Sequence, residues 1–270
     1  MKQKLSSLVG LACFVVSAHA DPAANDWAHA ASLLAATKAD VQSADITAVE
    51  RHRSELELAL ANARDALATA AAHNVVLTDG GAEAMMMLSA TALDKSKAPT
   101  SVQAVQNPYP AIALYLGSYY NEIGRPADAV RVIDLGLGSF SVSGVDLGAH
   151  LPILLGERGA ALNILHRSAE ALVSYDRALG ISDQPNSDRA RLERGRGFSL
   201  TELNRLDEAE AAYQESLELE PGNERAEHEL KYVAQLKSGI APTRGYLATV
   251  KPGQPATAPA TPPSEGTTPP

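Results

Sequence analysis

The chain has 270 residues and a formal net charge of −9, and alanine and leucine dominate its composition. This length suffices for one or two domains with a sizeable core. The acidic balance argues against nucleic acid and anionic membrane surfaces as partners. Long alternating runs of β-branched residues are missing, which favours an all-α fold.

The first 20 residues are typical of a secretory signal peptide. Two lysines precede a mostly apolar stretch from Leu5 to Val16, and the A-x-A sequence ending at Ala20 supplies a cleavage site. The apolar stretch is shorter than the roughly 20 residues that span a bilayer. We predict cleavage after Ala20, a periplasmic or secreted location, and no stable membrane insertion after cleavage. An uncleaved anchor is the alternative.

Cys13 raises the question of a bacterial lipoprotein. In G-L-A-C the leucine is misplaced for a lipobox, and the apolar run continues past the cysteine. We therefore expect no lipid at Cys13. Cleavage of the signal peptide removes this cysteine, so the mature chain forms no disulfide and depends on packing. Cleavage also removes two lysines, which takes the net charge to −11.

Residues 21–107 are predicted to form a helical region without a visible repeat. A first helix begins near Asn25 and puts Trp27, Ala31 and Leu34 on one face. Asp45 can cap a second, longer helix that runs to about residue 72. Its apolar stripe, mostly in steps of three and four residues, suits packing on a partner helix. That stripe contains Val49, Leu56, Leu60, Ala63, Leu67 and Ala70, and the helix starts at Ile46 and ends near Ala72.

A strand, a helix and a loop are expected in the rest of this region. Val75 to Leu77 reads as a short strand, Ala82 to Leu93 as a third helix, and the segment from Asp94 to Pro110 as a loop. The cluster Met85 to Met87 could line an adaptable groove or bind copper(I). Three consecutive residues cannot all face one groove on a helix, so we interpret the cluster as core packing.

Three related segments follow, and each predicts a pair of antiparallel helices. Aligned on a glycine in the first helix, they share a large residue three positions later, an alanine twelve later and another large residue sixteen later. The segments run from Ala113 to Leu137, Leu154 to Leu179 and Arg191 to Pro221. The aligned residues are Gly117, Tyr120, Ala129 and Ile133; Gly159, Leu162, Ala171 and Tyr175; and Gly197, Leu200, Ala209 and Tyr213.

This order of small and large residues suits two helices that cross closely. The glycine lets the second helix approach, and the large residue one turn on fills the space beside it. Gly124 ends the first helix of the first segment, and Pro126 starts its second helix. In the third segment Asn204 takes the turn and Pro221 stops the second helix.

The three segments resemble the tetratricopeptide repeat (TPR), whose pattern is L-G-x-x-Y, then alanine, an aromatic residue and proline. The third segment matches best, with Gly197, Tyr213 and Pro221, whereas Ser141 and Asp183 replace the proline in the other two. TPR units are about 34 residues long. The spacings of 42 and 38 residues between the alanines therefore imply inserted loops. A generic array of helical hairpins is the alternative.

The resemblance implies an α-solenoid of TPR-like hairpins with an additional helical N-terminal region. The predicted parts are a signal peptide at 1–20, a helical region at 21–107, repeats at about 108–141, 151–184 and 189–222 with a capping helix at 223–238, and a tail at 239–270. Asn223 is the predicted N-cap of the capping helix, which buries Leu230, Val233 and Leu236. The Pro- and Thr-rich tail has too little apolar surface to order.

We find no motif for catalysis, a metal or a cofactor in this sequence. H-E-x-x-H, G-x-S-x-G and a phosphate loop are all missing. Glu224, Glu227 and His228 form the nearest ligand-like cluster, which is more typical of a solvated helix face. Asp176 and Asp207 are expected to be ordinary surface charges. We therefore predict a non-enzyme without cofactor or metal.

The first helices of the hairpins would line a concave groove, which is the candidate binding surface that the resemblance implies. The implied groove residues lie three before, one after and four after each aligned glycine. They are Leu114, Ser118 and Asn121; Gly156, Ala160 and Asn163; and Arg194, Phe198 and Thr201. One family subset grips a peptide's C-terminal carboxylate with a lysine and asparagines. Leu114 and Ser118 stand where that lysine and an asparagine would be, so we expect no such clamp. Contacts with neighbouring helices are the alternative role of the groove residues.

Together these features predict a non-catalytic scaffold of the bacterial cell envelope that binds a protein or peptide on its concave surface, and no nucleic acid. Two alternatives stay open. One is an enzyme with a site between the N-terminal helices and the repeats, which a buried His–carboxylate pair in a cleft would favour. The other is a structural subunit of an envelope complex, for which an exposed apolar patch would be the sign.

Overall fold

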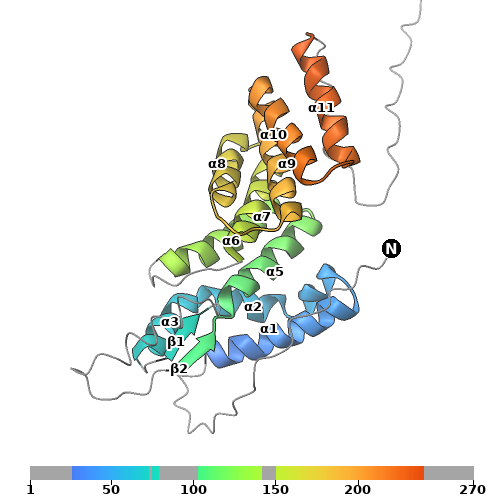
Figure 1. Cartoon of the computed structure of the whole chain (residues 1–270). Coiled ribbons are helices and arrows are strands. Elements are labelled where there is room, and N and C mark those ends of the chain that lie inside the picture. The colour runs from blue at the N-terminus through green and yellow to red at the C-terminus, as the bar shows by residue number, and fades with distance from the viewer. Residues whose placement is uncertain (1–25, 73–74, 79–102, 142–149, 240–270) are drawn as a thin grey trace, which may run out of the picture.

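The structure, a computed structural model, describes residues 26–72, 75–78, 103–141 and 150–239 (Figure 1). The predicted signal peptide, the predicted helix Ala82–Leu93 with its methionine cluster, and residues 240–270 of the predicted tail lie outside these residues. The N-terminal region contains α1 (Asp26–Ser43), the 3₁₀ helix η2 (Ile46–Arg51), α2 (Arg53–Ala61), α3 (Ala63–Ala72), β1 (Val75–Thr78) and β2 (Gln103–Gln106). The hairpins and last helix are α5 (Tyr109–Glu122) with α6 (Pro126–Ser141), α7 (His150–Ile164) with α8 (Ser168–Leu179), α9 (Asn186–Glu202) with α10 (Leu206–Leu219), and α11 (Glu224–Lys237).

The hairpins stack in chain order, with the N-terminal region at one end and α11 at the other (Figure 1). We call their first helices, α5, α7 and α9, the A helices. Each A helix contacts the next one directly, and α6 and α8 pack on the A helix that follows them. A stack in which each unit contacts its neighbours is an α-solenoid. The fold is therefore an all-α solenoid of TPR-like hairpins with an additional helical N-terminal region, to which one pair of short strands is added.

The two strands form a parallel pair, with Val75 opposite Gln103 and Thr78 opposite Gln106. The predicted strand at Val75 to Leu77 is confirmed as part of β1. The prediction of a continuous loop before the repeats is wrong, because it contains β2. Four residues carry too little of an alternating pattern to indicate a strand, and pairing with β1 decides its conformation.

The predicted single helix from Ile46 to Ala72 is also wrong, because the structure divides it into η2, α2 and α3. Asp45 does cap it, accepting a hydrogen bond from the Thr47 N–H at 2.8 Å. This bond spans two residues, as in an Asx turn, and the chain starts in a tight 3₁₀ turn. The first break lies at His52, whose ring is 3.1 Å from the Asp40 carboxylate of α1. All six residues of the predicted stripe are nevertheless buried.

A buried tyrosine pair joins the N-terminal region to the first hairpin. Tyr119 and Tyr120, adjacent on α5, donate hydrogen bonds to Glu50 of η2 and Glu57 of α2, the latter at 2.7 Å. Arg131 of α6 also reaches Glu57, at 2.6 Å. Burial, reinforced by the Glu50 contact, raises the pKa of Tyr119 to about 12. The hydroxyl therefore stays protonated and donates near neutral pH.

The aligned glycines make room for a side chain of the second helix. A Cβ at Gly117 would lie 2.7 Å from Ile133, and one at Gly159 would lie 2.7 Å from the Tyr175 ring. Gly197 has the same relation to Tyr213, at 2.9 Å. The sequence predicts close helices here, and the structure shows that the large residue sixteen positions on fills the space. Glycine is the residue that each of these A-helix positions accommodates without displacing that side chain.

A left-handed residue ends each A helix, at Gly124, His166 and Asn204, with φ of 72°, 57° and 57°. The predictions for Gly124 and Asn204 are confirmed, and sequence reasoning missed His166. In the first hairpin the Gly124 N–H bonds to Asn121 O and the Arg125 N–H to Tyr120 O, and the other two turns repeat this pair of bonds. This is the Schellman arrangement, which satisfies the last carbonyls of a helix.

The terminal helix α11 begins as predicted, because the Asn223 side chain accepts a hydrogen bond from the Ala226 N–H at 3.2 Å. Val233 is buried in a cluster with Leu200 of α9 and Tyr213 of α10, and Leu230 packs against this cluster. Lys237 closes the helix end with ion pairs to Asp207 and Glu210, both at 2.7 Å. Asp207 is a surface charge, as the sequence predicts, with its side chain 90% exposed, and it also pairs with Lys237.

Gly195→Ala is expected to destabilise the chain by about 1–2 kcal/mol, because crowding the buried Tyr175 ring outweighs the gain in helix propensity. The new methyl group would overlap the Tyr175 ring, which cannot retreat because Gly159 lies on another side of it. Gly138→Ala is the matched control, since a Cβ there meets nothing within 4 Å. We expect that variant to gain up to about 1 kcal/mol. Urea unfolding followed by circular dichroism measures both, and equal stabilities would contradict the packing argument.

The stability of α11 is expected to fall as pH rises through about 7, because burial raises the pKa of Glu229 from 4.5 to about 7. The folded state binds this proton more tightly than the unfolded state, so the contribution is full below about pH 4.5 and is lost above neutral pH. Glu229→Gln should remove this dependence and gain about 1–3 kcal/mol at pH 8. Hydrogen exchange of α11 at pH 5 and pH 8 measures it, and the exposed Glu227→Gln is the control.

Candidate functional site

Two neighbouring pockets lie along the A helices. We call the first the Lys38 pocket; it has a volume of about 430 Å³ and draws its walls from α1, η2, α5 and α7. Its lining residues are Lys38, Ile46, Ala111, Leu114, Tyr115, Ser118, His150 and Ile153. The lining is mostly apolar, and it includes no aspartate or glutamate. The N-terminal region thus contributes part of a surface that sequence reasoning assigned to the repeats.

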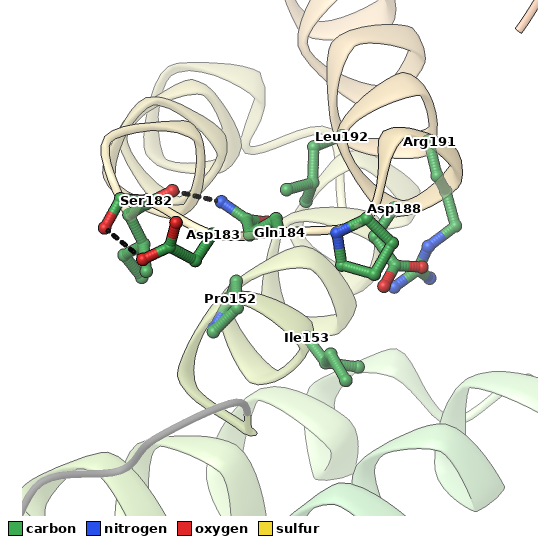
Figure 2. A pocket seen from close by; sticks show the side chains of 10 residues that line it. Pro152, Ile153, Ser182, Asp183, Gln184, Asp188, Arg191 and Leu192 are labelled. Carbon is green, nitrogen blue, oxygen red and sulfur yellow. Dashed lines mark hydrogen bonds between the residues drawn. The ribbon is translucent and has the colours of Figure 1, made fainter. Parts of the chain in front are cut away.

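The second pocket, which we call the Arg191 pocket, lies between α7, the loop after α8 and the start of α9 (Figure 2). It has a volume of about 480 Å³ and is lined by Pro152, Ile153, Ile181, Ser182, Asp183, Gln184, Pro185, Asp188, Arg191 and Leu192. The Gln184 amide donates to the carbonyls of Ala178 and Ile181, both at 2.7 Å, which fixes the loop against α8. Arg191 is held by Glu157 of α7 at 2.9 Å.

The two pockets adjoin at Ile153, which lines both. Ile153 lies six residues before its aligned glycine, as do Ala111 in the Lys38 pocket and Arg191 in the other. Sequence reasoning did not identify these three positions as groove residues. The row that they form continues the stripe of Leu114 and Ser118 by one three-residue step toward the helix start, and that step is the signal that could have revealed it.

Of the nine predicted groove residues, Leu114 and Ser118 line the Lys38 pocket. The other predicted residues line neither of these two pockets. Phe198 and Ala160 are half-buried on their A helices. Gly156 is buried and makes room for Leu192 of the next hairpin, since a Cβ there would lie 2.9 Å from the Leu192 side chain.

Asn121 and Asn163 connect consecutive A helices. The Asn121 amide donates to the Glu157 carbonyl of α7 at 3.2 Å, and the Asn163 amide donates to the Gly195 carbonyl of α9 at 3.4 Å. The Asn163 carbonyl oxygen also accepts from the Ser199 hydroxyl at 3.0 Å. These two predicted groove residues therefore make the inter-helix contacts that the sequence left open as their alternative role.

Arg194 and Thr201 are likewise engaged within the third hairpin. Arg194 is 17% exposed and bonds to Glu220 at 2.7 Å and to the Ser216 hydroxyl at 3.2 Å, both on or next to α10. The Thr201 hydroxyl donates to the Gly197 carbonyl of its own helix at 2.9 Å. Removing either side chain would disturb packing, so neither offers a clean test of ligand binding.

A second repeated contact aligns neighbouring hairpins. Arg158, directly before its aligned glycine, bonds to Asp134 of α6 at 2.6 Å. Arg196, at the same place in the third hairpin, bonds to Asp176 of α8 at 2.7 Å. Asp176 is exposed, as the sequence predicts for a surface charge, and it also forms this ion pair between hairpins. The repeated R-G pair before the alignment point was the missed signal.

The charged side chains described above form ion pairs between helices. Within the described ranges, no set of three His, Cys, Asp or Glu side chains is placed to hold a metal ion. No helix among the described residues has the length and apolar character needed to cross a membrane. Tyr115, in the wall of the Lys38 pocket, has its pKa raised by burial and stays protonated.

No protein-family model and no curated protein matches this chain. Among solved structures, the first TPR domain of human RPAP3 shares 23% identity at a TM-score of 0.42, covering 49% of this chain and 94% of that one. The first TPR of Spaghetti (RPAP3) bound to HSP90 peptide SRMEEVD gives 24% and 0.41, covering 48% and 94%. The second TPR domain of human RPAP3 with HSP70 peptide SGPTIEEVD gives 22% and 0.38, covering 46% and 98%.

Asn163→Ala is expected to cost about 1–3 kcal/mol of unfolding free energy, because it removes two hydrogen bonds between α7 and α9, one to the Gly195 carbonyl and one from the Ser199 hydroxyl. Ser118→Ala serves as the comparison, since Ser118 faces the Lys38 pocket. We expect that change to stay within about 0.5 kcal/mol of the parent chain. Urea unfolding of the two variants is the measurement. An Asn163→Ala variant as stable as the parent chain would show that these bonds contribute little to stability, and Asn163 would again be a candidate ligand contact.

Proposed function

We propose that this chain is a non-catalytic scaffold that binds a protein partner through a peptide segment laid across its A helices. The observation that carries the proposal is the pair of pockets adjoining at Ile153, which together extend from α1 to α9. Each volume lies within the roughly 300–1,000 Å³ typical of ligand sites. A peptide in extended form could place successive side chains into the two pockets.

The composition of the walls supports binding through side chains. Ile46, Leu114 and Ile153 supply apolar surface in the Lys38 pocket, and Ile181 does so in the Arg191 pocket. Polar groups at the edges can orient a ligand. Mostly apolar walls with few polar groups are typical of recognition sites. The rigid support comes from the Asn and Arg contacts between hairpins, which hold the walls in register.

The proposed place of action is the bacterial periplasm or the extracellular space. This rests on the basic, apolar and A-x-A order of residues 1–20. The partner would then be a protein of the cell envelope. The absence of cysteine after the proposed cleavage means that the scaffold would act independently of the redox state of that compartment.

Leu114→Glu and Ile153→Glu are expected to weaken peptide binding by at least about tenfold, since each puts a carboxylate into an apolar wall. The probe is the peptide most enriched when a displayed random heptapeptide library is selected on the chain. Fluorescence anisotropy with the labelled peptide gives the dissociation constant. Val173→Glu is the matched control, because Val173 is 66% exposed on α8 and lines neither pocket.

Retained affinity in both pocket variants would move binding away from the A helices. Failure of the library to enrich any peptide would contradict the proposal itself. Thermal unfolding of all three variants shows whether a loss of binding reflects a loss of folding.

A further inference from the structure

We propose that the Lys38 pocket selects a partner segment in which a bulky apolar residue stands next to an aspartate or glutamate. This inference rests on the proposed function and names the chemistry of its ligand. It also assigns a role to the N-terminal region, which would supply the charge that recognises the acidic residue. Without α1 and η2 the pocket would lack both Lys38 and Ile46.

Lys38 is a half-buried cation in a mostly apolar pocket, and it has no ion-pair partner among the described residues. The nearest carboxylate along α1, Asp40, is taken by Arg51 and His52, each at 3.1 Å. The arginines around the A helices are mostly paired, for example Arg158 with Asp134 and Arg191 with Glu157. Lys38 therefore differs from these arginines, because no carboxylate among the described residues pairs with it.

The sign of the pocket is opposite to that of the whole chain. None of its eight lining residues is an aspartate or glutamate, although the chain has a net charge of −9. An ammonium that loses water when a ligand enters must regain an interaction of similar strength. A carboxylate on the ligand meets that requirement, whereas a cationic or purely apolar ligand leaves Lys38 desolvated and unpaired.

The pocket also accepts an apolar side chain beside the charge. Leu114 lies three residues after Ala111 and four before Ser118, so these positions lie along one face of α5, and Ile46 and Ile153 join them from η2 and α7. A volume of about 430 Å³ has room for a large side chain and its neighbouring backbone. An apolar residue in the pocket would place an adjacent acidic residue within reach of the long, flexible lysine side chain.

The test is a charge swap read by the same displayed heptapeptide library. The parent chain should enrich peptides with an apolar residue next to Asp or Glu. Lys38→Glu should instead enrich an apolar residue next to Lys or Arg. Lys38→Gln, which keeps the size of the side chain and is the gentler change, should keep the apolar preference, lose the acidic one and bind the parent peptide about tenfold more weakly. Lys231→Glu, an exposed lysine on α11, is the control and should select the same peptides as the parent.

Two results would overturn the inference. Peptides without any acidic preference on the parent chain, or an unchanged preference in both Lys38 variants, would show that Lys38 does not read the ligand. In that case Leu114-dependent binding of those peptides would leave the proposed function standing. Enrichment of no peptide by any of the chains would instead refute the proposed function, and the inference with it.

Discussion

The packing of the Tyr175 ring between Gly159 and Gly195 is the contact on which the stack depends most. Tyr175 is 4% exposed and belongs to α8, Gly159 to its own A helix and Gly195 to the next one. One ring therefore sets both the separation of the helices inside the second hairpin and the distance to the third. The Gly–Ile and Gly–Tyr contacts of the first and third hairpins repeat the intra-hairpin half of this arrangement. Since interiors are close-packed, such contacts leave little freedom in how the helices cross.

Hydrogen bonds and ion pairs then fix how far each A helix is shifted along its neighbours, which close packing alone does not determine. The Asn121 and Asn163 amides bind backbone carbonyls of the following A helix, and Arg158 and Arg196 bind carboxylates of the preceding second helix. The arginine pairs are partly exposed, so each adds modest stability, whereas the largely buried amide bonds would be costly to break. Together they align Ala111, Ile153 and Arg191 in one row. The pockets lie along this row because neighbouring hairpins repeat the same offset.

The N-terminal region has the position of a further unit in front of the first hairpin. Tyr119 and Tyr120 fix it through Glu50 and Glu57, and its helices contact α5 much as one hairpin contacts the next. The consequence for the surface is direct, since the first pocket is completed by side chains from α1 and η2. At this end of the solenoid the N-terminal region therefore adds Ile46 and the positively charged Lys38 to the lining of the Lys38 pocket.

The helical hairpins, two of their three turns and their buried faces could be predicted from the sequence, because these depend on local spacing. Gly117, Gly159 and Gly197, the caps at Asp45 and Asn223, and the stripe from Val49 to Ala70 could all be identified from the order of residues. Contacts between distant parts of the chain set the breaks after Arg51 and Ala61, the pairing of β2 with β1, and which groove positions face a pocket. Asn121, Asn163 and Arg194 look like groove residues in the sequence, but their partners lie 22–36 residues away along the chain. Lys38 likewise meets Leu114 and Ile153 only after folding, since such long-range contacts leave no periodic signal in the sequence.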